Sequence, residues 1–174
     1  MLKKVKSFSL VELLAVVFVM IILLSFTTQK FLFFNKFILK NEVDRIFTLF
    51  SYLQQKAITS NTQQEIIFNL QNDSYLMNLQ SKENKLASVV RFGFLPNSYG
   101  PPSDPKKTIK DAITFKKIED NKFKVTFCSD GKIETGSIYF VDKDYKYMLA
   151  ITIPVSNVSY IRKYEYKNGK WLIR

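Results

Sequence analysis

One carboxylate, Glu12, stands near the start of a long apolar run and is the strongest candidate for chemistry in this chain. Residues 8–28 hold no other charged side chain, and three lysines precede them: Lys3, Lys4 and Lys6. An unpaired charge in a hydrocarbon environment costs about 2.5 to 3.5 kcal/mol on membrane-insertion scales. Glu12 is therefore expected to pair with a cation, and the pair is worth forming only where water is excluded.

A second candidate lies at the C-terminus, where basic and aromatic residues alternate. The basic residues are Arg162, Lys163, Lys167, Lys170 and Arg174, and the aromatic residues are Tyr160, Tyr164, Tyr166 and Trp171. Cations that contact phosphates and rings that stack on bases would together bind DNA. The alternative is an edge strand in which lysines oppose aggregation and the rings pack inward. The sequence leaves both interpretations open.

Several kinds of catalytic and metal site are excluded by composition. The chain has no histidine, which rules out Ser-His-Asp and Cys-His nucleophiles and His-bearing zinc sites. Cys128 is the single cysteine and is expected to be a small buried apolar residue. Asp142 and Asp144 supply too few ligands for calcium, which takes six to eight oxygens, so we expect a turn there. No enzyme activity, metal or cofactor is predicted.

Length and charge set broad limits. The 174 residues suffice for one domain, and the formal net charge is +11, with 26 Lys and Arg against 15 Asp and Glu. This charge favours anionic partners in general and selects none of them.

The elements that must position these residues begin with one long helix. No glycine occurs before Gly93 and no proline before Pro96, so nothing interrupts a helix over residues 8–61. In its second half, apolar residues recur at steps of three and four: Val43, Ile46, Phe47, Phe50, Leu53 and Ala57. This spacing predicts an amphipathic segment whose apolar face packs on a sheet.

Short apolar runs with turn residues between them follow, and they predict β-hairpins. One is centred on Asn72 and Asp73, one on residues 129–131, and one on Asn168 and Gly169. Residues 91–111 hold four of the five prolines and are expected to form a long surface loop.

The N-terminal pattern resembles the prepilin signal of the type IV pilin-like family, which includes the pseudopilins of type II secretion. In that family a basic leader ends in a small residue, Phe usually follows, and Glu stands at the fifth mature position. Here Ser7, Phe8 and Glu12 match this spacing, although the small residue is usually Gly. Ala57 and Ile58 at the helix end, and Phe127, Gly131 and Gly136 further on, resemble the minor pseudopilins of the GspH/FimT type.

The resemblance implies an α+β fold in which a long N-terminal helix packs on a small antiparallel β-sheet domain. It implies a leader at 1–7, a helix at 8–61 whose residues 8–28 are transmembrane, and a β-rich domain at 62–174. The protein would be single-pass in the cytoplasmic (inner) membrane, with its C-terminal domain extracytoplasmic. Prepilin peptidase would cut between Ser7 and Phe8 and methylate the amine of Phe8.

The function implied is assembly into, or at the tip of, a type II secretion pseudopilus or a type IV pilus-like filament that serves protein secretion. The partners are prepilin peptidase, other pseudopilin or pilin subunits and the cytoplasmic membrane, and Glu12 is the assembly residue. A DNA-binding minor pilin for natural transformation is the alternative, with DNA as a partner of the C-terminal cations. A single-pass anchor unrelated to filaments, or an ordinary secretory signal peptide, would also explain the apolar run.

Replacement of Ser7 by leucine is predicted to leave the leader attached, because the peptidase reads a small residue before Phe8. Intact mass or N-terminal sequencing of the wild type and of Ser7→Leu measures this. A wild-type chain that begins near Thr28 would instead support an ordinary signal peptide.

Overall fold

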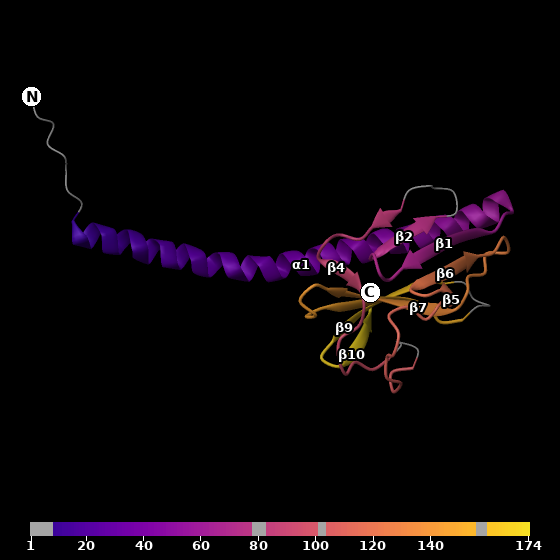
Figure 1. Cartoon of the computed structure of the whole chain (residues 1–174). Helices are drawn as coiled ribbons and strands as arrows, with labels where there is room; N and C mark the ends of the chain where they lie inside the picture. The colour runs from indigo at the N-terminus through magenta and orange to yellow at the C-terminus, as the bar shows by residue number, and fades with distance from the viewer. Residues whose placement is uncertain (1–8, 78–82, 101–103, 156–159) are drawn as a thin grey trace, which may run out of the picture. The chain divides into compact units, whose positions relative to one another are not determined.

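A computed structural model describes residues 9–77, 83–100, 104–155 and 160–174, with the backbone alone at residues 25–33. Its helix, α1, spans Leu10–Ser60, where the sequence predicts a helix over residues 8–61 (Figure 1). The helix ends at Asn61, whose φ of 50° is left-handed, and Thr62 N–H donates to the carbonyl of Ala57 at 3.2 Å. The chain forms two compact units, Met1–Phe34 and Asn35–Arg174.

The predicted membrane-spanning segment at residues 8–28, and with it the placement in the inner membrane, is wrong. Over the residues that the structure describes, no helix combines the length and the apolar character that crossing a membrane requires.

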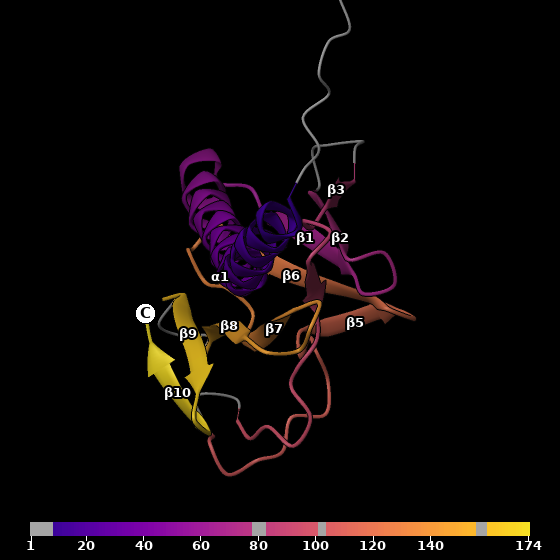
Figure 2. The same ribbon diagram turned by 90° about the vertical axis from the view of Figure 1, so that its left-hand side faces the viewer.

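The strands lie in two antiparallel sheets, which we call sheet A and sheet B (Figures 1 and 2). Sheet A has the order β3-β2-β1-β6-β5, and sheet B has the order β10-β9-β8-β7-β4. The strands of sheet A are β1 (Gln64–Asn69), β2 (Ser74–Met77), β3 (Asn84–Lys85), β5 (Lys116–Glu119) and β6 (Lys122–Phe127). Those of sheet B are β4 (Val90–Phe92), β7 (Gly136–Asp142), β8 (Met148–Ile153), β9 (Arg162–Lys167) and β10 (Lys170–Ile173).

The predicted fold class, a long helix on one small antiparallel sheet, is therefore wrong. The described residues hold ten strands in two five-stranded sheets, and the chain beyond α1 is mostly β. The reason lies in β7 and β8, which are buried at nearly every position and so must be covered on both faces. One face meets α1 and sheet A, and residues 93–111 cover the other through Leu95 and Ile109.

The hairpin predictions have different outcomes. The β1–β2 and β9–β10 hairpins are confirmed, and Asn168 and Gly169 have the positive φ values, 49° and 76°, of a two-residue turn. At residues 129–131 the chain does turn back, with an antiparallel bridge between Phe127 and Ile133, but the two strands predicted to pair there do not, because β6 belongs to sheet A and β7 to sheet B. The loop predicted at residues 91–111 begins as strand β4, and its residues 101–103 lie outside the described residues.

The main core forms where α1, from Asn35 onward, meets both sheets (Figure 2). Phe50 lies 5.3 Å, centroid to centroid and edge to face, from Phe127 in sheet A, and 6.0 Å from Phe68. Phe68 contacts Phe92 at 5.6 Å, and Phe92 contacts Phe140 of sheet B at 5.5 Å. A row of five aromatic rings thus connects the helix to both sheets, with geometries that aromatic pairs prefer.

Two glycines noted in the sequence have clear packing reasons. Gly131 has a φ of 83°, and its carbonyl accepts a hydrogen bond from Gln54 Nε2 at 2.8 Å, which holds the crossing between the sheets against α1. A Cβ at Gly136 would lie 2.5 Å from the ring of Phe115. Any side chain at Gly136 would therefore displace a buried ring, and this accounts for the spacing of Phe127, Gly131 and Gly136.

Phe50→Ala is predicted to lower the free energy of unfolding by about 3 to 5 kcal/mol, because it leaves a cavity among buried rings. Denaturant unfolding of the full chain in detergent measures this. The matched control is Tyr52→Ala two residues away, where the side chain is 57% exposed and the change should stay within about 0.5 kcal/mol. Equal effects of the two variants would contradict the described packing of α1.

Candidate functional site

The first unit presents an apolar helical surface, which we call the apolar segment and define as residues 10–24 of α1. All of its large apolar side chains are 40% to 80% exposed, and they lie all round the helix. A helix that is apolar on every side is stable only when other apolar groups cover it. An exposed patch of this extent is typical of an interaction surface.

Glu12 occupies the third position of α1, inside this segment. Ser9 precedes the helix as its N-cap, since its Oγ accepts the N–H of Val11 at 3.2 Å. Ser9 and Glu12 thus have the spacing of a capping box, and a carboxylate in the first turn interacts favourably with the helix dipole. Among the described residues no cation pairs with Glu12. Ser7 and Phe8, the predicted cleavage and methylation residues, lie outside the described residues.

The sequence features of this segment carry the family resemblance, so comparison with known proteins bears on it directly. No family model, curated protein or solved structure matches this chain. The role of Glu12 is therefore argued from its position and surroundings.

The aromatic residues of the C-terminal hairpin pack inward rather than forming a stacking surface. Trp171 lies 4.9 Å from Tyr166 and 5.8 Å from Tyr139, centroid to centroid, on the face of sheet B away from α1. Its Nε1 donates to the carbonyl of Tyr99 at 2.8 Å, which ties the hairpin to the loop at residues 93–111. This arrangement matches the edge-strand alternative, and it leaves Tyr164, Tyr166 and Trp171 half-buried against one another.

Four of the five predicted DNA-binding cations, Lys163, Lys167, Lys170 and Arg174, lie on the same face of the β9–β10 hairpin, but carboxylates hold two of them. Lys163 Nζ pairs with Asp44 of α1 at 2.7 Å, and Lys167 Nζ lies 3.5 Å from Glu165. Arg162 stacks over the ring of Tyr160 at 4.3 Å. Lys170 and Arg174 are exposed, and neither has an ion pair within the described residues. On the face that the four cations share, the cations without an ion pair in the described residues are therefore these two.

A charge cluster that the sequence analysis missed surrounds Glu165, which is 7% exposed on β9. Lys36 Nζ lies 3.1 Å from its carboxylate and Lys40 Nζ lies 3.8 Å away, both from α1. Burial acts to raise the pKa of Glu165, but the hydrogen bond from Lys36 and the three lysine charges hold that pKa below its ordinary value of 4.5. Burial, opposed by Glu165, lowers the pKa of Lys40. The sequence gives no sign of this cluster, because residues 36–40 and residue 165 are far apart in the chain and form no local pattern.

The remaining candidates have structural roles. Asp142 is buried, and its Oδ1 accepts the N–H groups of Lys146 and Tyr147 at 2.8 and 2.7 Å, so it closes the turn between β7 and β8. Asp144 Oδ2 accepts from Asn35 Nδ2 of α1 at 3.1 Å. The predicted turn is confirmed, although Asp142 lies inside the protein. Cys128, expected to be a small buried apolar residue, is half-buried.

Glu165→Gln is predicted to lower the free energy of unfolding at neutral pH by about 1.5 to 3 kcal/mol, because three lysines lose their shared carboxylate. Since the pKa of Glu165 is lower in the folded state than 4.5, the unfolded state binds more protons near that pH. The free energy of unfolding of the wild type should then fall as the pH drops through and below 4.5. That of Glu165→Gln should fall less over the same range.

Denaturant unfolding of the full chain between pH 7 and pH 3 measures this dependence. Asp111→Asn, which removes an exposed carboxylate without an ion pair in the described residues, is the control and should follow the wild type. Parallel pH profiles for Glu165→Gln and the wild type would contradict the cluster.

Proposed function

We propose that this protein is a subunit of a type IV pilin-like filament, a minor pseudopilin or minor pilin of the GspH/FimT type that serves protein secretion. The single observation that carries the proposal is the apolar segment, exposed on all sides and bearing one carboxylate. The subunits of the filament assemble by packing their apolar segments into a helical bundle, and no catalysis is involved.

The energetics of the apolar segment support this assembly. Full burial of one Val, Leu, Ile, Phe or Met side chain stabilises by about 1.5 to 3 kcal/mol, and the segment is almost entirely made of such residues. Because the exposed side chains surround the helix, one flat partner surface would cover only part of them. Several neighbouring helices would cover them all, as in helix bundles.

Glu12 supplies the specificity of this packing. Cleavage after Ser7 would leave an ammonium group on Phe8, and methylation would keep its charge. In a bundle that excludes water, the ammonium of one subunit would neutralise Glu12 of the next. A charge left unpaired there is strongly unfavourable, so only registers that bring the two groups together are stable. Prepilin peptidase and the other subunits are the partners.

The DNA-uptake alternative has weaker support. The rings that would stack on bases pack against sheet B, and Lys163 and Lys167 are paired with carboxylates. On the face that these cations share, Lys170 and Arg174 are the ones without a carboxylate partner in the described residues, and two contacts contribute little to binding at physiological salt. The filament role explains the apolar segment, which DNA binding does not.

Glu12→Gln is predicted to prevent assembly while leaving the fold intact. Glutamine can still act at the third helix position of a capping box, so this variant removes the charge and retains the capping group. The measurement is crosslinking of subunits in sheared filaments from cells that carry the cognate secretion genes, with cleavage of the leader checked by mass. The loss should be nearly complete, since a charge without its partner costs about 3 to 5 kcal/mol per contact when buried.

Ser9→Ala is the matched control, because it removes the N-cap and keeps the carboxylate. It should cost about 1 kcal/mol of helix stability and still assemble. If Glu12→Gln assembles normally while Ser9→Ala does not, Glu12 serves the helix terminus and the filament proposal loses its main support.

A further inference from the structure

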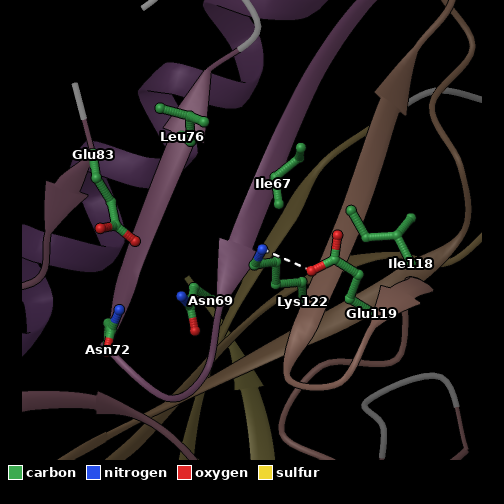
Figure 3. Close-up of a pocket in the computed structure, with 8 residues that line it drawn as sticks. All are labelled: Ile67, Asn69, Asn72, Leu76, Glu83, Ile118, Glu119 and Lys122. Carbon is green, nitrogen blue, oxygen red and sulfur yellow. Dashed lines mark hydrogen bonds and ion pairs between the residues drawn. The ribbon is translucent and has the colours of Figure 1, made fainter. Parts of the chain in front are cut away.

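The outer face of sheet A, opposite α1, contains a groove of about 400 Å³. Figure 3 shows its apolar floor, formed by Ile67 of β1, Leu76 of β2 and Ile118 of β5. Ile118 lies at a break in the β5–β6 register between Lys117 and Glu119. Such a bulge redirects a side chain, and here Ile118 joins the lining of the groove.

Carboxylates flank this floor on both sides. Glu83 lies on the β2 side and Glu119 on the β5 side (Figure 3). Lys122 Nζ pairs with Glu119 at 2.7 Å, whereas within the described residues no cation pairs with Glu83, whose Oε1 accepts from the hydroxyl of Ser74. A ligand that fits would have an apolar centre and at least one cationic end, directed at Glu83.

The edge of sheet B has the complementary arrangement. Strand β10 is the outermost strand, and side chains alternate along it, so Lys170, Leu172 and Arg174 lie on one side of the hairpin. Leu172 is 48% exposed, and the two cations at its sides are exposed and without ion pairs in the described residues. An open strand edge with exposed apolar side chains is prone to pair with another chain.

We propose that the groove receives the β10 edge of a second copy of this chain, with Leu172 on the apolar floor and Lys170 at Glu83. The charges are complementary, because the groove offers Glu83 without a cation partner in the described residues, in a chain whose net charge is +11. Both figures of the whole chain show β10 well apart from β2 and β5, so one molecule cannot join its own two surfaces (Figures 1 and 2). The contact is head-to-tail, and contacts of this type continue into open chains. This inference deepens the proposed filament function and rests on it.

The test uses single-cysteine copies of the full chain, purified in detergent that covers the apolar segment. Cys128 is replaced by serine, and Leu76→Cys is made in one copy and Leu172→Cys in another. After oxidation, the mixture should form a disulfide-linked heterodimer, and neither copy alone should form a comparable homodimer. The control pair, Leu172→Cys with Tyr145→Cys, places the second thiol on an exposed turn residue outside the groove and should give only background product.

Charge exchange tests the pairing itself. Glu83→Lys in the Leu76→Cys copy, or Lys170→Glu in the Leu172→Cys copy, should each remove most of the heterodimer, and the two changes together should restore it. Heterodimer at the level of the control pair would overturn the inference. So would an equally abundant Leu172→Cys homodimer, which would mean that two β10 edges pair with each other.

Repetition with Glu12→Gln in both copies separates this inference from the filament proposal. The disulfide should form equally well, because Glu12 lies outside the groove and the β10 edge. If the heterodimer is absent while assembly in cells still depends on Glu12, the groove contact alone is lost. If the heterodimer forms and assembly is independent of Glu12, the filament mechanism is lost and the contact stands.

Discussion

The contact of Phe50 with Phe127 and Phe68 is the interaction on which the rest of the structure depends. It is where one helix face meets sheet A, and through Phe92 and Phe140 the same row of rings reaches sheet B. Neither sheet could bury its inner face without the other, since both share the apolar face of α1. The strand order follows from this constraint, because the chain passes from one sheet to the other around a common core.

The contact between α1 and the far end of sheet B is of a different kind. It is made by charges, with Lys36 and Lys40 at Glu165 and Asp44 at Lys163, and by Lys36 over the ring of Tyr147 at 4.9 Å. Charge pairs that are half-exposed stabilise less than apolar packing but tolerate fewer alternative arrangements. The rings pack the helix against both sheets, and the charges connect it to β9.

The helix and the apolar face of its second half could be predicted because they depend on local spacing. Phe50 and Leu53 are buried as their positions predict, and Asn168 and Gly169 form the expected turn. The division into two sheets could not be predicted in the same way. The turn at residues 129–131 looks in sequence like a link between two paired strands, whereas β6 before it and β7 after it belong to different sheets, and its Gly131 bonds to Gln54, 77 residues away. The same holds for Glu165, whose partners come from α1, and for the groove, whose lining comes from three strands.

Trp171 is the only tryptophan of the chain, and its position has a practical consequence. The indole packs the last hairpin against the loop at residues 93–111, and a Cβ on Gly100 would collide with its Nε1. Its fluorescence therefore reports on the seating of the hairpin and not on the aromatic row at the opposite face of sheet B. Two parts of the fold therefore have separate optical signals. Tryptophan fluorescence reports on the outer layer, made of the last hairpin and the loop at residues 93–111, and far-ultraviolet dichroism reports on the helix. Comparing the two during unfolding distinguishes loss of the outer layer from collapse of the whole domain.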